Sequence, residues 1–184
     1  LSHATLPSQI SGTSSLEECL DEAEAVVVVT PSSTLREFAQ KMKPLLEENT
    51  PLIMCSKGVE EDTGYLPVEI FGDVIGNPDR LAVLSGPNHA EEVIARIPSG
   101  TVIASRSEQT AVRFRNLFST PYFRGYTSDD YVGVELCAAF KNVIAIGVGI
   151  SYGIGFGDNT AAMLMTRGMA EMSRLVEARG GQAM

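Results

Sequence analysis

The sequence predicts a doubly wound α/β domain with a parallel sheet, followed by the first long helices of an all-α domain. Its first two-thirds alternates short β-rich runs with helical stretches, and runs such as residues 25–30 are apolar without interruption. Such strands are typical of a sheet that helices cover on both faces. After Asp129 and Asp130 the pattern changes to two long helices joined by a glycine-rich turn. We therefore expect one domain over residues 1–128 and the start of a second over 129–184.

The individual elements follow from local signals along the chain. Ser14 and Glu17 have the spacing of a capping box, which predicts a short helix before the first strand. Pro44 predicts a kink or break near the end of the helix after that strand, and Asp158 is expected to cap the second long helix. Apolar runs predict strands at residues 25–30, 51–56, 81–85, 101–105 and 122–127. Helices are expected from 32 to about 48, at 66–75, from 90 onward, and at 108–118, 131–152 and 159–179.

Composition and charge exclude several classes of function. The net charge of −9 and the pI near 4.7 disfavour nonspecific binding to nucleic acid or anionic lipid, since both require a positive field. Three separated cysteines without a Cys-x-x-Cys pair suggest buried thiols in a reduced, cytoplasmic protein. With two histidines and no metal-ligand spacing, we expect no metal.

No membrane span or signal peptide is expected. The longest apolar candidate, residues 142–157, has sixteen residues and five glycines, whereas a bilayer requires roughly 20 apolar residues. The N-terminus shows no basic start followed by an apolar core.

Lys141 is the only cation in residues 125–166, and its neighbours at helical spacing are apolar. A buried ammonium is destabilising unless it is paired, hydrated or discharged. Burial also lowers the pKa of an ammonium group toward the range useful for proton transfer. One interpretation is therefore a general acid/base in a cleft, and the other is a lysine that extends to the surface from a helix edge.

Three short segments directly follow predicted strands, at the edge of the sheet where ligands bind in such folds. Pro31-Ser32 can simply begin a helix, and Lys57-Gly58 can be an exposed loop. Gly86-Pro87-Asn88 offers a glycine and free N–H groups at a helix start, although Gly-Pro is also a common turn. Because all three lie on one edge, together they indicate a ligand crevice.

Five spaced motifs identify a resemblance that runs in order from about residue 10 to residue 181. They are Ser56-Lys57-Gly58, Leu84-Ser85-Gly86-Pro87 with Ala90-Glu91-Glu92-Val93, Gly133-Val134-Glu135-Leu136 with Lys141-Asn142-Val143, Gly153-x-Gly155-x-Gly157-Asp158-Asn159, and Thr166-Arg167-Gly168-x-Ala170-Glu171-Met172. In these motifs the chain resembles the bacterial type of NAD(P)-dependent glycerol-3-phosphate dehydrogenase.

The resemblance implies a Rossmann-like domain and a helical domain in a cytoplasmic enzyme that uses NAD or NADP, as a monomer or a homodimer. The enzyme would interconvert dihydroxyacetone phosphate and sn-glycerol 3-phosphate for phospholipid synthesis. Lys141 would accept the proton in oxidation and donate it in reduction. The positions implied for substrate binding are Lys57, Gly86, Asn88 and Asn142, and those implied for cofactor binding are Pro31, Lys57 and Ala90.

The chain also departs from the family pattern. Asn88 and His89 stand where the family more often has a small hydroxyl residue and an aromatic residue. No Gly-x-Gly-x-x-Gly motif occurs, and no Arg-Asn pair follows the last predicted helix. We therefore expect a fragment with a partial Rossmann-like sheet, which lacks its N-terminal βαβ portion and most of its helical domain and is inactive alone.

Two alternatives remain. Ketopantoate reductases and 3-hydroxyacid dehydrogenases also place a lysine on a helix after a dinucleotide domain, but usually with asparagine four residues later, where this chain has Ala145. The chain could also be a non-catalytic binding module derived from a dehydrogenase.

Overall fold

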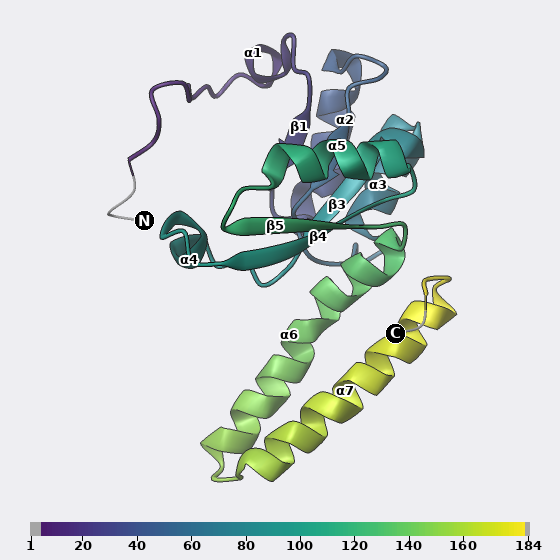
Figure 1. The fold of residues 1–184 in the computed structure, drawn as a ribbon. Coiled ribbons are helices and arrows are strands. Elements are labelled where there is room, and N and C mark those ends of the chain that lie inside the picture. The colour runs from purple at the N-terminus through teal and green to yellow at the C-terminus, as the bar shows by residue number, and fades with distance from the viewer. Residues whose placement is uncertain (1–4, 183–184) are drawn as a thin grey trace.

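A single five-stranded sheet and a long helical hairpin make up the computed structural model, which describes residues 5–182 (Figure 1). The strands are β1 (Val26–Val28), β2 (Leu52–Met54), β3 (Leu81–Ser85), β4 (Ser99–Ser105) and β5 (Phe123–Ser128). The α-helices are α1 (Leu16–Leu20), α2 (Leu35–Met42), α3 (Pro67–Ile75), α4 (Ala90–Ile94), α5 (Glu108–Phe118), α6 (Tyr131–Gly153) and α7 (Asp158–Ala178). Three short 3-10 helices are η1 (Ser32–Thr34), η2 (Lys43–Leu45) and η3 (Pro78–Arg80).

The sheet is mixed, so the expectation of a wholly parallel sheet is wrong. The strands follow one another in sequence order, and β1, β2 and β3 are parallel, as are β4 and β5. β4 runs antiparallel to β3, with Ser85 opposite Val102. A parallel connection requires a helix that crosses and covers the sheet, whereas α4 is five residues long and has no buried residue. The chain therefore turns back directly beside β3.

Helices cover both faces of the sheet, as the uninterrupted apolar strands predict. Leu52 and Met54 pack with α2 and α3 in one core, where Phe71 is fully buried. Ile53, which lies between them in the sequence, packs in the opposite core against Phe114 of α5. Successive residues of a strand point to opposite faces. Since both faces of β2 are buried, the strand is apolar at every position.

One outer edge of the sheet is formed by β1, which pairs with β2 alone among the described strands. Val27 and Val29 are 43% and 71% exposed there. An exposed apolar edge strand is a site for pairing with another strand.

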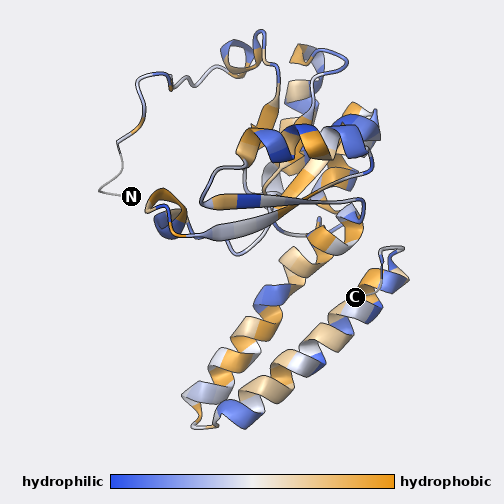
Figure 2. Cartoon of the chain, in the orientation of Figure 1, coloured by the Kyte–Doolittle hydropathy of each residue, from blue (hydrophilic) through white to orange (hydrophobic). Residues whose placement is uncertain are grey.

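The hairpin of α6 and α7 extends away from the sheet, and its two helices lie side by side (Figure 1). It is joined to the sheet layer by an apolar cluster of Leu66, Leu136 and Val176. Farther along, α6 continues to carry apolar residues (Figure 2). Among them, Val143 and Ile146 are 65% and 64% exposed.

By length and composition alone, the 23-residue helix α6 could cross a membrane, and 22% of its apolar 18-residue window is buried in the structure. The sixteen-residue estimate from the sequence was therefore too short, because the apolar helix starts before residue 142. The absence of a membrane span stays a prediction.

Two predicted helix starts are displaced by one residue. Ser15, not Ser14, caps α1, and its hydroxyl accepts a hydrogen bond from the Glu18 N–H at 3.2 Å. Gly157 occupies the cap position of α7, and Asp158 is the first helical residue. The Asp158 carboxylate accepts a hydrogen bond from the Tyr152 hydroxyl at 2.9 Å. Because it lies in the first turn, its negative charge still interacts favourably with the helix dipole. The predicted break at Pro44 is confirmed, since α2 ends and η2 begins there.

Two glycines of the hairpin should respond oppositely to alanine. A Cβ at Gly168 would lie 2.5, 2.7 and 3.0 Å from three atoms of the Ile144 side chain, whereas a Cβ at Gly147 would meet nothing within 4 Å. Glycine to alanine gains about 1 kcal/mol in a helix interior, and overpacking costs about 1–3 kcal/mol. We expect Gly147→Ala to raise the free energy of unfolding and Gly168→Ala to lower it, measured by urea denaturation with circular dichroism. Equal stabilisation by both would show that α6 and α7 are not closely packed at Gly168.

Candidate active site

A cavity of about 430 Å³ lies between the sheet and the helical hairpin, at the carboxyl ends of β2 and β3. We call it the sheet–hairpin cavity. Its lining comprises Lys57, Ser85, Gly86, Pro87, Val102, Ser128, Asp130, Gly133, Val134, Cys137, Ala138, Lys141, Met172, Val176 and Gln182. It therefore combines the segments after two strands with one side of α6 and the end of α7.

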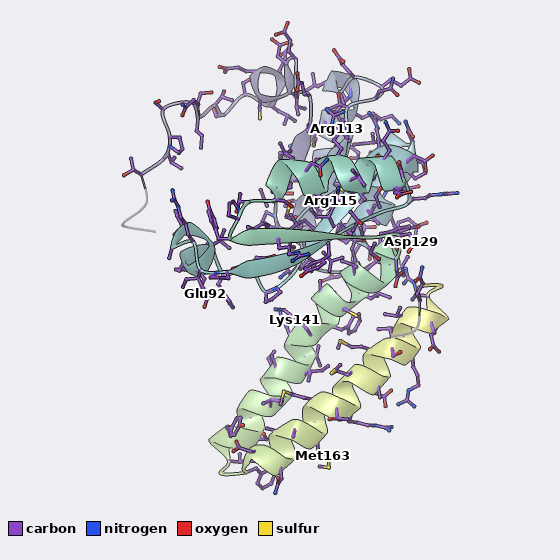
Figure 3. The ribbon with its side chains drawn as sticks, in the orientation of Figure 1. Glu92, Arg113, Arg115, Asp129, Lys141 and Met163 are labelled. Atoms are coloured by element: carbon purple, nitrogen blue, oxygen red, sulfur yellow. The ribbon has the colours of Figure 1, made fainter. Side chains whose placement is uncertain are left out.

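Two lysines from different layers line this cavity. Lys57 follows β2, and Lys141 lies on the part of α6 nearer the sheet (Figure 3). The pKa of Lys57 is lowered by partial burial and then by the positive charge of Lys141. The two ammonium groups outnumber Asp130, the one carboxylate of the lining, so the cavity has a local positive charge in an acidic chain. Such a charge attracts an anionic ligand.

Lys141 itself is exposed among the described residues. The reason lies in its neighbours along the helix. Ala145 is also exposed, and Ile144 and Val148 are only partly buried. The apolar sequence around Lys141 thus marks a helix side that the described residues leave largely open, although the residue still lines the cavity.

The position of Lys57 is set by a turn that only glycine fits. Gly58 has φ +145°, and a Cβ there would lie 2.8 Å from both Cβ and Oγ of Ser32. The Ser56 hydroxyl donates a hydrogen bond to the Thr30 carbonyl, which ties the segment after β2 to the segment after β1. The two strand-end segments therefore lie together, as the sequence predicted.

Farther along the same loop, Glu60 forms an ion pair with Arg36 of α2. Its guanidinium donates two hydrogen bonds to the Glu60 carboxylate, at 2.8 and 2.9 Å, and a third to Asp73 of α3 at 2.6 Å. The hydrogen bond from Arg36, followed by one from Thr63, lowers the pKa of Glu60 to about 2. Because the carboxylate stays ionised, the loop that carries Lys57 is held against two helices.

Gly86 brings the backbone close to β4. A Cβ at this residue would lie 2.8 Å from the Gly100 carbonyl oxygen and 2.9 Å from the Asn88 side-chain oxygen. The expected close-approach glycine is therefore present. The Asn88 amide nitrogen donates to the same Gly100 carbonyl at 3.0 Å, which directs Asn88 into the fold, and Asn88 does not line the cavity.

Several polar atoms near this edge are buried without a hydrogen-bond partner among the described residues. They are the Thr30 hydroxyl after β1, the side-chain oxygen of Asn88 after β3, and the Thr101 hydroxyl on β4. A buried polar atom without a partner costs roughly 1–3 kcal/mol. Their position beside the ligand edge fits a polar ligand that contacts this part of the sheet.

The other predicted site residues lie outside the cavity lining. Pro31 is exposed before η1, and its carbonyl accepts a hydrogen bond from the Thr34 N–H. Ala90 is the exposed first residue of α4, and Asn142 is exposed on α6. The structure thus brings together Lys57, Gly86 and Lys141, and the roles of the other residues stay predictions.

Sequence reasoning missed Asp130, which lines the cavity and caps α6. Its carboxylate accepts hydrogen bonds from the Gly133 N–H at 2.8 Å and from the Gln182 N–H at 3.1 Å. It thereby ties the start of α6 to the segment after α7. An aspartate directly before a long apolar run is a helix-cap signal, which was used only to place a domain boundary.

Neither metal ligation nor a reactive thiol is indicated. In residues 5–182 no three His, Cys, Asp or Glu side chains are grouped for a metal, and the absence of a metal stays a prediction. The expectation of buried thiols is wrong for Cys19, which is exposed, while Cys55 and Cys137 are half-buried. Burial, followed by the charge of Asp130, raises the pKa of Cys137 in the cavity. This thiol is therefore protonated near neutral pH.

Comparisons with known proteins agree with this arrangement. The model described as "NAD-dependent glycerol-3-phosphate dehydrogenase N-terminus" matches residues 1–111, and the corresponding C-terminus model matches residues 130–184. Two curated relatives are named glycerol-3-phosphate dehydrogenase [NAD(P)+]. The relative from Syntrophomonas wolfei is 44% identical over 97% of this chain and 52% of its own length, and the relative from Pelotomaculum thermopropionicum is 49% identical over 92% and 49%.

Solved structures show the same fold. The glycerol-3-phosphate dehydrogenase of Coxiella burnetii has a TM-score of 0.85 at 37% identity, covering 91% of this chain and 51% of that one. The enzyme GPD1 of Saccharomyces cerevisiae has a TM-score of 0.86 at 27% identity, covering 97% and 53%. The chain spans about half the length of the curated relatives it matches. By both family models, this chain belongs to the NAD-dependent glycerol-3-phosphate dehydrogenase family.

Proposed function

We propose that the protein containing this chain interconverts dihydroxyacetone phosphate and sn-glycerol 3-phosphate with NAD or NADP, in the cytoplasm, for phospholipid precursor synthesis. The observation that carries the proposal is the convergence of Lys57, Gly86 and Lys141 on the sheet–hairpin cavity in a chain of this family. The cavity lies where α/β folds bind ligands, at the carboxyl ends of the strands, and two lysines give it positive charge.

The two lysines suit a substrate that carries a phosphate and a carbonyl. When the carbonyl is reduced, negative charge develops on its oxygen, and an ammonium within hydrogen-bond reach stabilises this charge. Lys141 then transfers a proton from Nζ to that oxygen, and in oxidation it accepts the proton from the hydroxyl. The nicotinamide, when bound, supplies or accepts the hydride.

Lys57 supports the same chemistry from the opposite layer. Its pKa is lowered by burial and by the charge of Lys141, because the two ammonium groups repel each other. An anionic substrate between them relieves this repulsion, and part of its binding energy comes from that relief. We propose that Lys57 contacts both substrate and cofactor, with Gly86 allowing the substrate close to the backbone.

The described residues fit the reacting end of a nicotinamide cofactor better than its pyrophosphate. The unpartnered Thr30 and Thr101 hydroxyls and the Asn88 oxygen lie near the ligand edge. Pro31, Lys57 and Ala90 would hold the cofactor there. However, no Gly-x-Gly-x-x-Gly turn occurs in the sequence to bind a pyrophosphate at a helix start. We propose that this turn belongs to the portion of the relatives that this chain does not match.

The test uses a completed enzyme, which we define as the Syntrophomonas wolfei relative with its matching segment replaced by this chain. We expect it to oxidise NADH or NADPH when dihydroxyacetone phosphate is added, measured spectrophotometrically, and not when ketopantoate or a 3-oxoacid is added. A folded completed enzyme that binds NADH without oxidising it would instead support the non-catalytic binding module. Oxidation of NADH or NADPH with ketopantoate but not with dihydroxyacetone phosphate would support the competing dehydrogenase class, which the family matches do not favour.

A further inference from the structure

Glu135 of α6 is a buried acid outside the lining of the sheet–hairpin cavity. It is 3% exposed, and its two carboxyl oxygens accept from the Val68 N–H at 3.2 and 3.3 Å. Val68 is the second residue of α3, so its N–H has no partner within its own helix. Six residues after Glu135, the same helix carries Lys141.

The burial of this acid is costly. Desolvation raises the pKa of Glu135 well above its ordinary value, although the hydrogen bond from Val68 opposes that rise. The neighbouring Leu136 already supplies apolar packing at this interface, and a further apolar side chain would avoid the desolvation cost. What an apolar side chain cannot supply is a directional acceptor for the first turn of α3.

We propose that Glu135 is a positioning residue for Lys141, because its hydrogen bond to α3 fixes the rotation of α6 about its own axis. This inference rests on the proposed function. The apolar cluster of Leu66, Leu136 and Val176 holds the two layers together, but apolar contact is non-directional and tolerates small rotations. A hydrogen bond to one backbone N–H is directional and does not tolerate such rotations.

The geometry gives this constraint a large effect at the lysine. A side chain ends roughly 6 Å from the axis of its helix, so a rotation of about 30° moves its tip by about 3 Å. A displacement of about 1 Å at a reacting group can cost roughly 100-fold in rate. Glu135 therefore controls the position of the Lys141 amine, to which the rate of proton transfer is highly sensitive.

The same corner of α3 also bears on Lys57. The loop that begins after β2 carries Lys57 and ends where α3 begins. Arg179, from the end of α7, donates to the Gly64 carbonyl at 3.1 Å and to the Glu69 carboxylate at 3.0 Å. Both helices of the hairpin are thus tied to the start of α3, and Glu135 is the tie that comes from the helix bearing Lys141.

The test compares three variants of the completed enzyme. Glu135→Leu keeps the size of the side chain but removes the acceptor, Glu135→Gln keeps one acceptor oxygen, and Leu136→Ala weakens the same interface without removing the hydrogen bond. We expect Glu135→Leu to lower kcat by about ten- to hundredfold, with KM for dihydroxyacetone phosphate and Kd for NADH little changed. Glu135→Gln should largely restore kcat. Leu136→Ala should lower only the temperature of unfolding.

A second readout concerns Lys57, whose pKa is lowered partly by the charge of Lys141. If Glu135→Leu lets Lys141 turn away, the pKa of Lys57 should rise, as measured by the pH dependence of amine labelling read by mass spectrometry. This readout needs no turnover, so it tests the positioning role even if the completed enzyme proves inactive and the proposed function fails.

Equal kcat and equal Lys57 pKa in Glu135→Leu and Leu136→Ala would overturn the proposal, as Glu135 would then be only structural. Should Glu135→Leu fail to fold, Glu135→Met removes the same carboxylate acceptor with a flexible apolar side chain that adapts to the space. The same loss of kcat is expected in that variant, and an unchanged kcat would likewise overturn the proposal.

Discussion

Replacing Lys141 by alanine in the completed enzyme should lower kcat by about 10²–10⁴-fold, the usual contribution of a general acid/base. The alanine cannot transfer a proton to the oxygen where charge develops, and one of the two positive charges of the cavity is lost with it. Kd for NADH should change little, because the larger part of a dinucleotide is bound at the pyrophosphate turn and ribose. Stopped-flow turnover and fluorescence titration with NADH measure the two quantities separately.

Lys43→Ala is the matched control for this experiment. Lys43 is an exposed lysine in η2, outside the cavity lining, so its replacement removes the same charge from the protein without touching the site. It should leave both kcat and Kd unchanged. Equal rates for Lys141→Ala and Lys43→Ala would remove Lys141 from the mechanism.

The fold could be predicted as far as local sequence determines it. The bounds of β3 and α5 agree with those predicted, because an apolar run and an amphipathic stretch each end at clear polar or turn residues. The direction of β4 could not be predicted in the same way. Apolar strands buried on both faces look alike whether they run parallel or antiparallel, and the direction is set by the short exposed α4.

The candidate site was predictable in part for a similar reason. Residues at the carboxyl ends of parallel strands meet at one edge, which located Lys57 and Gly86 from the sequence alone. The partners of a polar group are a property of the assembled fold. Nothing in the sequence shows that Asn88 turns inward to Gly100, or that Glu135 reaches Val68 across 67 residues of chain.

The exposure of Lys141 illustrates the same limit. Helical spacing shows that its neighbours are apolar, but apolar neighbours enclose a side chain only if another element covers them. Val143 and Ile146, close to Lys141 on α6, are 65% and 64% exposed. The apolar pattern therefore indicates a surface suited to burial, but it does not show whether the described residues cover that surface.

The 184-residue chain by itself should bind NADH weakly and show no detectable turnover with dihydroxyacetone phosphate. The completed enzyme should bind NADH more tightly and turn over this substrate. The sequence has no Gly-x-Gly-x-x-Gly turn for the pyrophosphate. Val27 of β1 and Val29 directly after it are exposed at a sheet edge that no other described strand pairs. Binding at the reacting end alone leaves the nicotinamide without the contacts that orient it for hydride transfer, and orientation accounts for a large share of such rates. Fluorescence titration with NADH and a spectrophotometric assay, run on both proteins after circular dichroism confirms that each is folded, provide the comparison. Turnover by the isolated chain at the rate of the completed enzyme would show that residues 1–184 already contain a whole cofactor site, and the partial Rossmann-like assignment would then be wrong.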